Sequence, residues 1–241
     1  MPRAPRQMRL TAEHVKRVHR DIADPGPKVW PEFRPATDDD YNANVADILA
    51  TRPPGPLWLF GYGSLIWRPE TAFVDQRVAL ARGWHRRFCL GWDYRYRGNV
   101  EQPGLMMALD RGGQCKGVAY QLPEATLTDE LHKLMRREVS MVPSAFPYRF
   151  IDVSTDGGPL RVLTFAMDRK STRYVADLDD AALAGVLATA VGFRGSMAEY
   201  LFSTVQKLEE LGIHDRNLWR LQALVADKID AAHTGALSAP F

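Results

Sequence analysis

The sequence predicts an α+β protein with a strand-rich core and a helical C-terminal third. Short apolar segments bounded by Gly, Pro or Asp recur between residues 57 and 167, which is typical of β-strands. Apolar residues at helical spacing dominate after residue 178. A run of strands followed by a run of helices favours an α+β fold over alternating βαβ units.

The chain divides into three regions by composition. Residues 1–55 are predicted to form an N-terminal extension that is partly helical, residues 56–235 a folded domain, and residues 236–241 a tail. Within the extension, T-A-E-H-V-K-R-V-H-R-D-I predicts one short helix capped by Thr11, and Pro- and Gly-rich segments follow it.

Composition limits the classes of function. The 241 residues are 46% hydrophobic and 25% charged, as in ordinary soluble globular proteins. A net charge of +2 favours neither nucleic acid nor a membrane surface as the partner, but leaves room for a local anion-binding site. The two cysteines, Cys89 and Cys115, indicate a reduced cytoplasmic protein without a disulfide framework. No signal peptide or membrane-spanning run is predicted.

Apolar segments from Leu57 onward predict roughly six or seven strands. In order they read L-W-L-F, R-V-A-L-A, R-R-F-C-L-G-W, L-M-M-A-L-D, C-K-G-V-A-Y-Q-L, Y-R-F-I-D-V and L-R-V-L-T-F-A-M. The last two flank the turn residues T-D-G-G-P, so residues 148–167 predict a β-hairpin.

One helix interrupts the strands and carries an acidic residue on its apolar face. It begins at Thr126 or Thr128, and Glu138 follows Leu131 by about two helical turns. The predicted inward stripe therefore ends in a carboxylate, while the basic side chains point elsewhere. The stripe comprises Leu127, Leu131, Leu134, Met135 and Glu138, and the basic residues are Lys133, Arg136 and Arg137.

A carboxylate among leucines is costly unless it is paired or neutralised. Burial would raise the pKa of Glu138 above the ordinary value of about 4.3, which suits a base or acid near neutral pH. Two other interpretations stay open: the helix ends by Arg136 and leaves Glu138 in a loop, or Glu138 forms an ion pair with an arginine.

Three further helices are predicted in the C-terminal third. The first has an acidic first turn and Gly192 just past its end. Ser196 and Glu199 form a capping box for the second, which runs through Leu208. Asp215 caps the last helix. Its predicted inward residues are Leu218, Leu221, Val225 and Ile229.

The stretch L-W-L-F-G-Y-G-S-L-I-W-R at residues 57–68 contains a glycine-rich turn without a helix-start signal. Its glycines could let several N–H groups converge on an anion, or the segment could simply join two strands. A dinucleotide fingerprint is excluded because Ile66 stands where a third glycine is required. Ser64 is not in a G-x-S-x-G sequence, which argues against a hydrolase nucleophile.

Arginines alternate with aromatic residues between residues 82 and 97. We interpret this as a sheet with aromatic side chains inward and arginines in water, or as a few arginines lining an anion pocket. Binding of single-stranded nucleic acid is the alternative. The six histidines lack the spacing of metal ligands, so no metal site is predicted.

The segment F-G-Y-G-S-L-I-W resembles the ChaC-like γ-glutamylcyclotransferases, in their glutathione-specific branch. The resemblance continues in the family's order over about residues 57 to 230. It includes R-R-F-C-L-G-W-D-Y-R-Y-R-G, P-G-L-M-M-A-L-D, G-x-C-K-G-V-A-Y-Q-L-P, R-R-E at 136–138 and A-E-Y-L-F at 198–202.

This resemblance implies a small, mostly antiparallel β-barrel with surrounding helices, in which residues 56–235 form the catalytic domain. It implies cleavage of glutathione to 5-oxoproline and cysteinylglycine without a metal or cofactor. Two alternatives remain: action on other γ-glutamyl amines or peptides, and binding of a γ-glutamyl ligand without catalysis. Whether the protein is a monomer or a dimer stays open.

The resemblance also implies roles for individual residues. Glu138 aligns with the catalytic acid/base of the family. Substrate binding is expected at Gly61, Tyr62, Gly63, Ser64, Leu65, Arg86, Asp93 and Tyr200. After the glutamate this chain continues V-S-M-V, where eukaryotic members have Gly-Gly-Tyr, so the wall beside the leaving half of the substrate is expected to differ.

Overall fold

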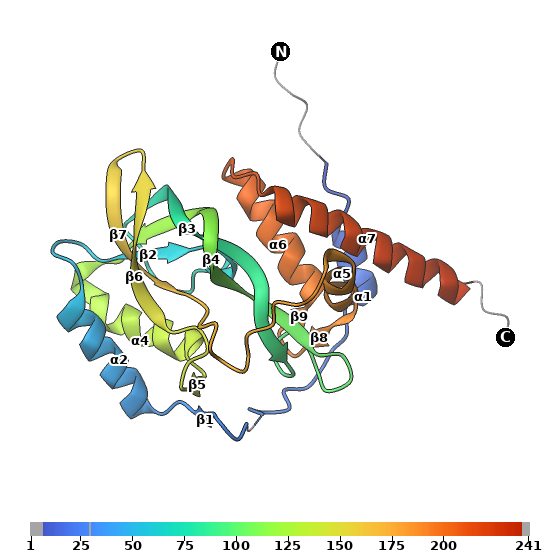
Figure 1. Cartoon of the computed structure of the whole chain (residues 1–241), viewed down its shortest axis with the longest axis horizontal. Helices are drawn as coiled ribbons and strands as arrows, with labels where there is room; N and C mark the ends of the chain where they lie inside the picture. Colours follow the sequence, from blue (N-terminus) through green and yellow to red (C-terminus); the bar gives the residue numbers. More distant parts are fainter. Residues whose placement is uncertain (1–6, 29, 238–241) are drawn as a thin grey trace, which may run out of the picture. The chain divides into compact units, whose positions relative to one another are not determined.

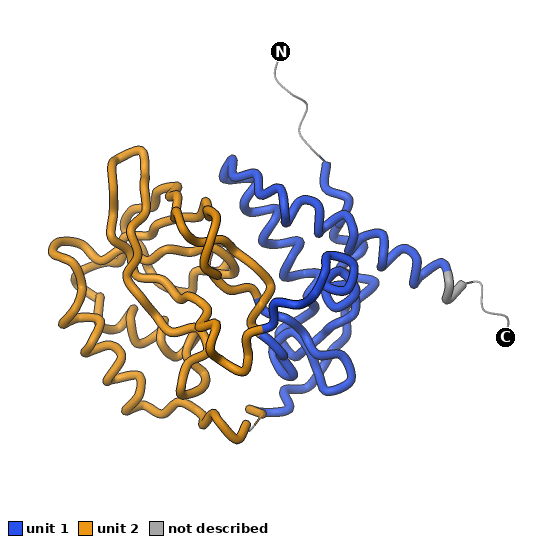
Figure 2. The backbone as a smooth tube through the Cα atoms, viewed as in Figure 1, with its two compact units in different colours: residues 1–26, 91–106, 175–241 blue, residues 27–90, 107–174 orange. Residues whose placement is uncertain are grey.

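The computed structural model describes residues 7–28 and 30–237, which cluster into two compact units (Figure 2). Unit 1 holds the described residues of 1–26, 91–106 and 175–241, and unit 2 holds those of 27–90 and 107–174. Two long strands, β3 (Asp75–Asp93) and β4 (Gly104–Gln121), contribute residues to both units.

Unit 2 is built on a closed β-barrel (Figure 1). The five strands follow the order β2-β4-β3-β6-β7, and the other three are β2 (Trp58–Gly61), β6 (Tyr148–Thr155) and β7 (Gly158–Phe165). β2 pairs antiparallel with β4 and parallel with β7, so the barrel is mixed. The predicted small barrel with surrounding helices is confirmed.

Glycines make the strands longer than the sequence predicted. The segments R-V-A-L-A and R-R-F-C-L-G-W form the single strand β3, with Gly83 between them at φ +78°. The predicted strands L-M-M-A-L-D and C-K-G-V-A-Y-Q-L likewise merge into β4. Gly112 and Gly113 lie between them, and both have positive φ. Glycine turns the backbone at such positions without steric cost, so the strand bends and continues. The predicted β6–β7 hairpin is confirmed, with Thr155 opposite Gly158.

Helices and a short sheet surround the barrel strands of unit 2. They are β1 (Arg34–Pro35), α2 (Asp38–Thr51), α3 (Ser64–Trp67), η1 (Glu124–Thr126), α4 (Leu127–Glu138) and β5 (Met141–Val142). We did not predict α2. Its start nevertheless has a capping box, because the Asp40 carboxylate accepts hydrogen bonds from the Thr37 amide and hydroxyl, both at 2.8 Å.

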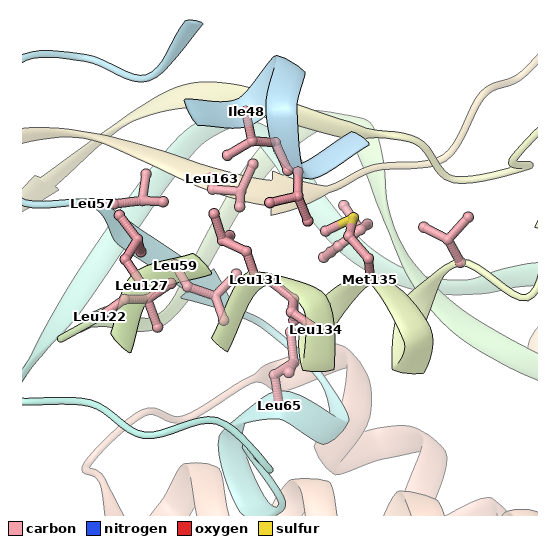
Figure 3. Close-up of a cluster of buried hydrophobic side chains, with 13 residues drawn as sticks. Ile48, Leu57, Leu59, Leu65, Leu122, Leu127, Leu131, Leu134, Met135 and Leu163 are labelled. Carbon is pink, nitrogen blue, oxygen red and sulfur yellow. The ribbon is translucent and has the colours of Figure 1, made fainter. Parts of the chain in front are cut away.

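The core of unit 2 joins α2, α4 and the barrel (Figure 3). Ile48 of α2 packs in the same buried cluster as Leu131 of α4 and Leu163 of β7. Leu65, at the start of α3, belongs to the same cluster. Residues upstream of Leu57 therefore supply part of the apolar core that supports α4.

Unit 1 is mainly helical. Its elements are α1 (Ala12–Val18), α5 (Asp180–Thr189), β8 (Val191–Gly192), β9 (Gly195–Ser196), α6 (Met197–Glu210) and α7 (Arg216–Leu237). Thr11 and Ser196 are N-cap residues as predicted, and the Asp215 carboxylate caps α7 by accepting from the Leu218 amide at 3.1 Å. The four predicted inward residues of α7 are buried. None of the described helices is long and apolar enough to cross a membrane.

The prediction that Gly192 ends a helix is wrong. α5 ends at Thr189, and Gly192 lies in β8, where it pairs with Gly195. A Cβ atom at Gly192 would lie 2.4 Å from the carbonyl oxygen of Arg95. Glycine is needed there because two backbone segments approach closely, and not because a helix terminates.

Candidate active site

The glycine-rich turn leads from barrel strand β2 into the single helical turn of α3, which begins at Ser64. Our prediction of a turn without a helix start is therefore wrong in one respect. The helix is short because Pro69 follows closely, and α3 already ends at Trp67. Ser64 and Leu65 thus lie on the first turn of a helix, and Leu65 is buried against the core that also holds α4.

The two glycines of the turn do not have the left-handed backbone of an anion nest. Neither Gly61 nor Gly63 has a positive φ, and Gly63 has φ −132°. Gly61 instead permits close packing, because a Cβ atom there would lie 3.2 Å from both the Leu65 Cβ and the Tyr120 ring. Tyr62, between them, is buried among barrel residues.

Glu138 is the last residue of α4, so the alternative that the helix ends by Arg136 is excluded. Its side chain is only 15% exposed. The inward stripe predicted for α4 is confirmed, since Leu127, Leu131, Leu134 and Met135 are all buried. The other alternative, an ion pair with an arginine, is realised: Arg137 Nε lies 3.0 Å from Glu138 Oε1.

Burial raises the pKa of the Glu138 carboxyl above its ordinary value. The Arg137 guanidinium opposes this by its charge and hydrogen bond, whereas the nearby Glu70 carboxylate adds to it. Glu138 also lies at the helix C-terminus, where the partial negative charge of the backbone disfavours a carboxylate. The result is a carboxyl group with a raised pKa next to a cation, as expected for a general base or acid near neutral pH.

Arg137 connects Glu138 to the turn that follows β2. We predicted that Arg137 points away from the stripe, but its side chain is only 16% exposed. One nitrogen, Nη2, donates to the Ser64 hydroxyl at 3.2 Å, and Nη1 donates to the carbonyl of Pro69 at 3.0 Å and to that of Arg68. A single side chain therefore holds the predicted catalytic glutamate and the predicted substrate loop together.

Glu70 is a second residue of this cluster that the sequence did not indicate. Its Oε1 lies 2.6 Å from Arg68 Nε, and its Oε2 lies 3.4 Å from Arg137 Nη1. Glu70 has φ +55°, a conformation uncommon for residues other than glycine. No sequence pattern marks this geometry in advance.

Arg86, also predicted to bind substrate, lies on β3 in unit 2 and is 6% exposed. Its Nη2 atom donates to the carbonyl of Lys116 and lies 3.3 Å from the Cys115 sulfur. The expectation that the arginines of residues 82–97 point into water is thus wrong for Arg86. It is also wrong for Arg97, since both side chains are buried against polar partners.

Asp93 and Tyr200 belong to unit 1. The Asp93 carboxylate accepts hydrogen bonds from three backbone amides of the loop that follows it, those of Arg95, Tyr96 and Arg97, at 2.6–3.1 Å. Arg97 in turn pairs with Glu199 at 2.5 Å, and its guanidinium lies 5.7 Å from the centre of the Tyr200 ring. These contacts give Asp93 a role in shaping its own loop, and its role in substrate binding stays a prediction.

Comparison with known proteins assigns the family. The chain is 41% identical over 178 residues to the glutathione-specific γ-glutamylcyclotransferase of Escherichia coli, covering 73% of this chain and 76% of that protein. It is 33% identical to the glutathione-specific γ-glutamylcyclotransferase 1 of Mus musculus, covering 66% and 72%.

The fold comparison agrees. A crystal structure of a γ-glutamyl cyclotransferase specific to glutathione from yeast has a TM-score of 0.65 and 20% identity, covering 71% of this chain and 96% of that one. The model of the protein family described as ChaC-like protein matches residues 57–228 of this chain. These residues include the loop after β2 and Glu138. The chain belongs to the ChaC-like family.

Proposed function

We propose that this protein is a γ-glutamylcyclotransferase that cleaves glutathione to 5-oxoproline and cysteinylglycine. The observation that carries this proposal is the single guanidinium of Arg137, which contacts both the Ser64 hydroxyl and the Glu138 carboxylate. The predicted acid/base and the predicted substrate loop are thereby adjacent. The names of the relatives from E. coli and mouse supply the substrate.

The reaction needs no nucleophile from the protein. The α-amino group of the γ-glutamyl residue attacks its own γ-carbonyl carbon, a five-membered ring closes, and the bond to the cysteinyl nitrogen breaks. An α-ammonium with a pKa near 8 is mostly protonated at neutral pH and cannot attack. A base must therefore remove one proton, and an acid must deliver one to the leaving nitrogen.

Glu138 is suited to both steps. Its raised pKa makes it a better proton acceptor than an ordinary carboxylate, and the proton it accepts is the one that the leaving amine needs. Acid/base catalysis of this kind contributes about 10² to 10⁴ in rate. The reaction can therefore run at a single carboxyl group without a change in net charge at the site.

The Gly61–Leu65 loop is proposed to hold the γ-glutamyl end in the folded conformation that ring closure requires. Well-oriented intramolecular reactions reach effective molarities of about 10⁵ to 10⁸ M, so conformational control can exceed the acid/base contribution. Support comes from the packing of the loop, because Leu65 lies in the buried cluster that also fixes Leu131 and Leu134 of α4. Loop and base are supported by the same core.

The test is Glu138→Gln, which removes the exchangeable carboxyl proton and keeps the shape of the side chain. We expect release of 5-oxoproline from glutathione to fall about 100-fold or more. Binding of glutathione, measured by calorimetry, should persist. Asp129→Asn is the matched control, because it makes the same change at an exposed position of α4 and should leave turnover unchanged. Turnover of Glu138→Gln equal to that of the wild type would refute the assignment.

Substrate range is tested in parallel with γ-glutamyl-alanine and γ-glutamyl-lysine. Faster release of 5-oxoproline from either of these than from glutathione would replace the glutathione-specific assignment with the broader one. Saturable binding of γ-glutamyl compounds without any 5-oxoproline would indicate a binding protein on the same scaffold. Cytoplasmic location is part of the proposal, supported by the two buried cysteines, Cys89 and Cys115, neither of which is in a disulfide.

A further inference from the structure

We propose that Arg137 is the positioning residue of this site: it fixes the Glu138 carboxylate against the turn after β2, and Glu70 weakens that hold by competing for the same guanidinium. The inference rests on the proposed function in one respect, the identity of Glu138 as the base. It adds two residues to which neither the sequence patterns nor the family resemblance gave a role.

The geometry of Arg137 requires a guanidinium. Its Nε atom meets the Glu138 carboxylate at 3.0 Å, Nη2 donates to Ser64 Oγ at 3.2 Å, and Nη1 donates to the carbonyl of Pro69 at 3.0 Å. These partners lie in three directions around one planar group. Arginine presents five N–H donors in a fixed fork, whereas lysine presents one compact ammonium that cannot reach all three.

Glu70 competes for this fork. Its Oε2 lies 3.4 Å from Arg137 Nη1, while its Oε1 is held at 2.6 Å by Arg68. Glu70 has φ +55°, a backbone conformation that residues with a Cβ atom usually avoid. Its carboxylate contacts two cations, Arg68 and Arg137, so Arg137 is shared between Glu70 and Glu138.

Two opposing charges therefore face Glu138. Arg137, from the same helix, favours the ionised carboxylate and lowers its pKa, and Glu70, from the segment after α3, disfavours it and raises its pKa. If Arg137 acted alone, Glu138 would be a weaker base. If Glu70 acted alone, Glu138 would stay protonated at higher pH and could not accept a proton. The balance sets the pH range in which one carboxyl group can both accept and donate.

The test uses the full-length chain with Arg137→Met, Arg137→Lys and Glu70→Gln. Titration of Glu138 is followed by the ¹³C NMR signal of its carboxyl carbon, assigned by its loss in Glu138→Gln, and turnover of glutathione is measured across pH. Arg137→Met should move the titration and the acid limb of kcat/KM to higher pH. Its kcat should fall about 100-fold, as for a catalytic group displaced by about 1 Å. Glu70→Gln should move both curves to lower pH.

Arg137→Lys separates charge from geometry. It keeps the cation, so both curves should stay near those of the wild type, but kcat should still fall about 10-fold or more because the contacts to Ser64 and the Pro69 carbonyl are lost. A wild-type kcat in this variant would overturn the positioning role. The NMR titration and the pH profile of kcat/KM both report the pKa of the Glu138 carboxyl. An arginine with a purely structural role would not change that pKa.

Arg136→Met is the matched control. Arg136 carries the same charge on the same turn of α4, but pairs with Asp38 at 2.6 Å and lies over the Tyr41 ring. Its variant should leave the Glu138 titration unchanged. The proposal is overturned if Arg137→Met titrates like the wild type, or if Arg136→Met shifts equally. The NMR titration is independent of activity, so a protein that releases no 5-oxoproline would contradict the proposed function and still test this inference.

Discussion

Ile48→Ala tests whether the segment before the family match stabilises the unit that holds the candidate active site. Ile48 lies on α2 and is 0% exposed, packed in the cluster that contains Leu131 of α4. The substitution removes three carbon groups, worth about 0.8 kcal/mol each, or about 2.4 kcal/mol in transfer free energy. A partly unfilled cavity adds to this, so we expect a loss of about 3 kcal/mol in the free energy of unfolding, within the usual range of about 2–5 kcal/mol.

The measurement is urea denaturation of the full-length chain, followed by far-UV circular dichroism, with a thermal scan in parallel. For a protein of this size each 1 kcal/mol lowers Tm by about 2–4 °C, so the expected decrease is about 6–12 °C. Asn42→Ala, at an exposed position of the same helix, is the control and should change Tm little. A decrease below about 2 °C for Ile48→Ala would refute the reasoning, because α2 would then contribute no stability to the unit that holds Glu138.

Three further predictions concern the site and its surroundings. Tyr62→Phe removes only the hydroxyl of a buried ring, so the fold should persist, and a raised KM for glutathione would support the role of the loop, while an unchanged KM would contradict it. Glu138→Gln should raise Tm at pH 8 but not near pH 4. The pKa of Glu138 is higher in the folded state than in the unfolded state. The contribution of Glu138 to folding stability is therefore fully present below the unfolded-state pKa of about 4.3, and it is lost as pH rises through the folded-state pKa. An equal Tm difference at both pH values would argue against this linkage. Gly192→Ala places a Cβ atom 2.4 Å from the Arg95 carbonyl oxygen and should cost about 1–3 kcal/mol in chemical denaturation, whereas Gly185→Ala in α5, with open space around it, should be neutral or stabilising.

Several features of the site could be predicted because they depend on local periodicity. The position of Glu138 on the apolar stripe followed from helical spacing alone, and α4 carries it to its last residue. The N-caps Ser196 and Asp215 followed from side chains that satisfy free amides. Such features involve residues within one or two turns of each other, so the sequence contains all that is needed.

The features that were missed depend on contacts between distant segments. Arg137 reads as a solvated basic residue, and only the fold brings Ser64 and the Pro69 carbonyl within reach of it. Gly192 reads as a helix terminator, and its real constraint is the backbone near Arg95. The helix α2 is a different case, since its T-D-D-D start does carry a local signal that we did not use.

The residues immediately after Glu138 pair with a segment that lies outside the family match. β5 follows Glu138 and pairs with β1, and the Ala36 amide donates to the Ser140 carbonyl at 3.1 Å. A chain shortened to residues 57–228 would expose that edge of β5 to water and remove Ile48 from the cluster against α4. If such a fragment had low activity, the loss of these contacts next to Glu138 would be a sufficient cause, and the low activity would not argue against the proposed role of Glu138.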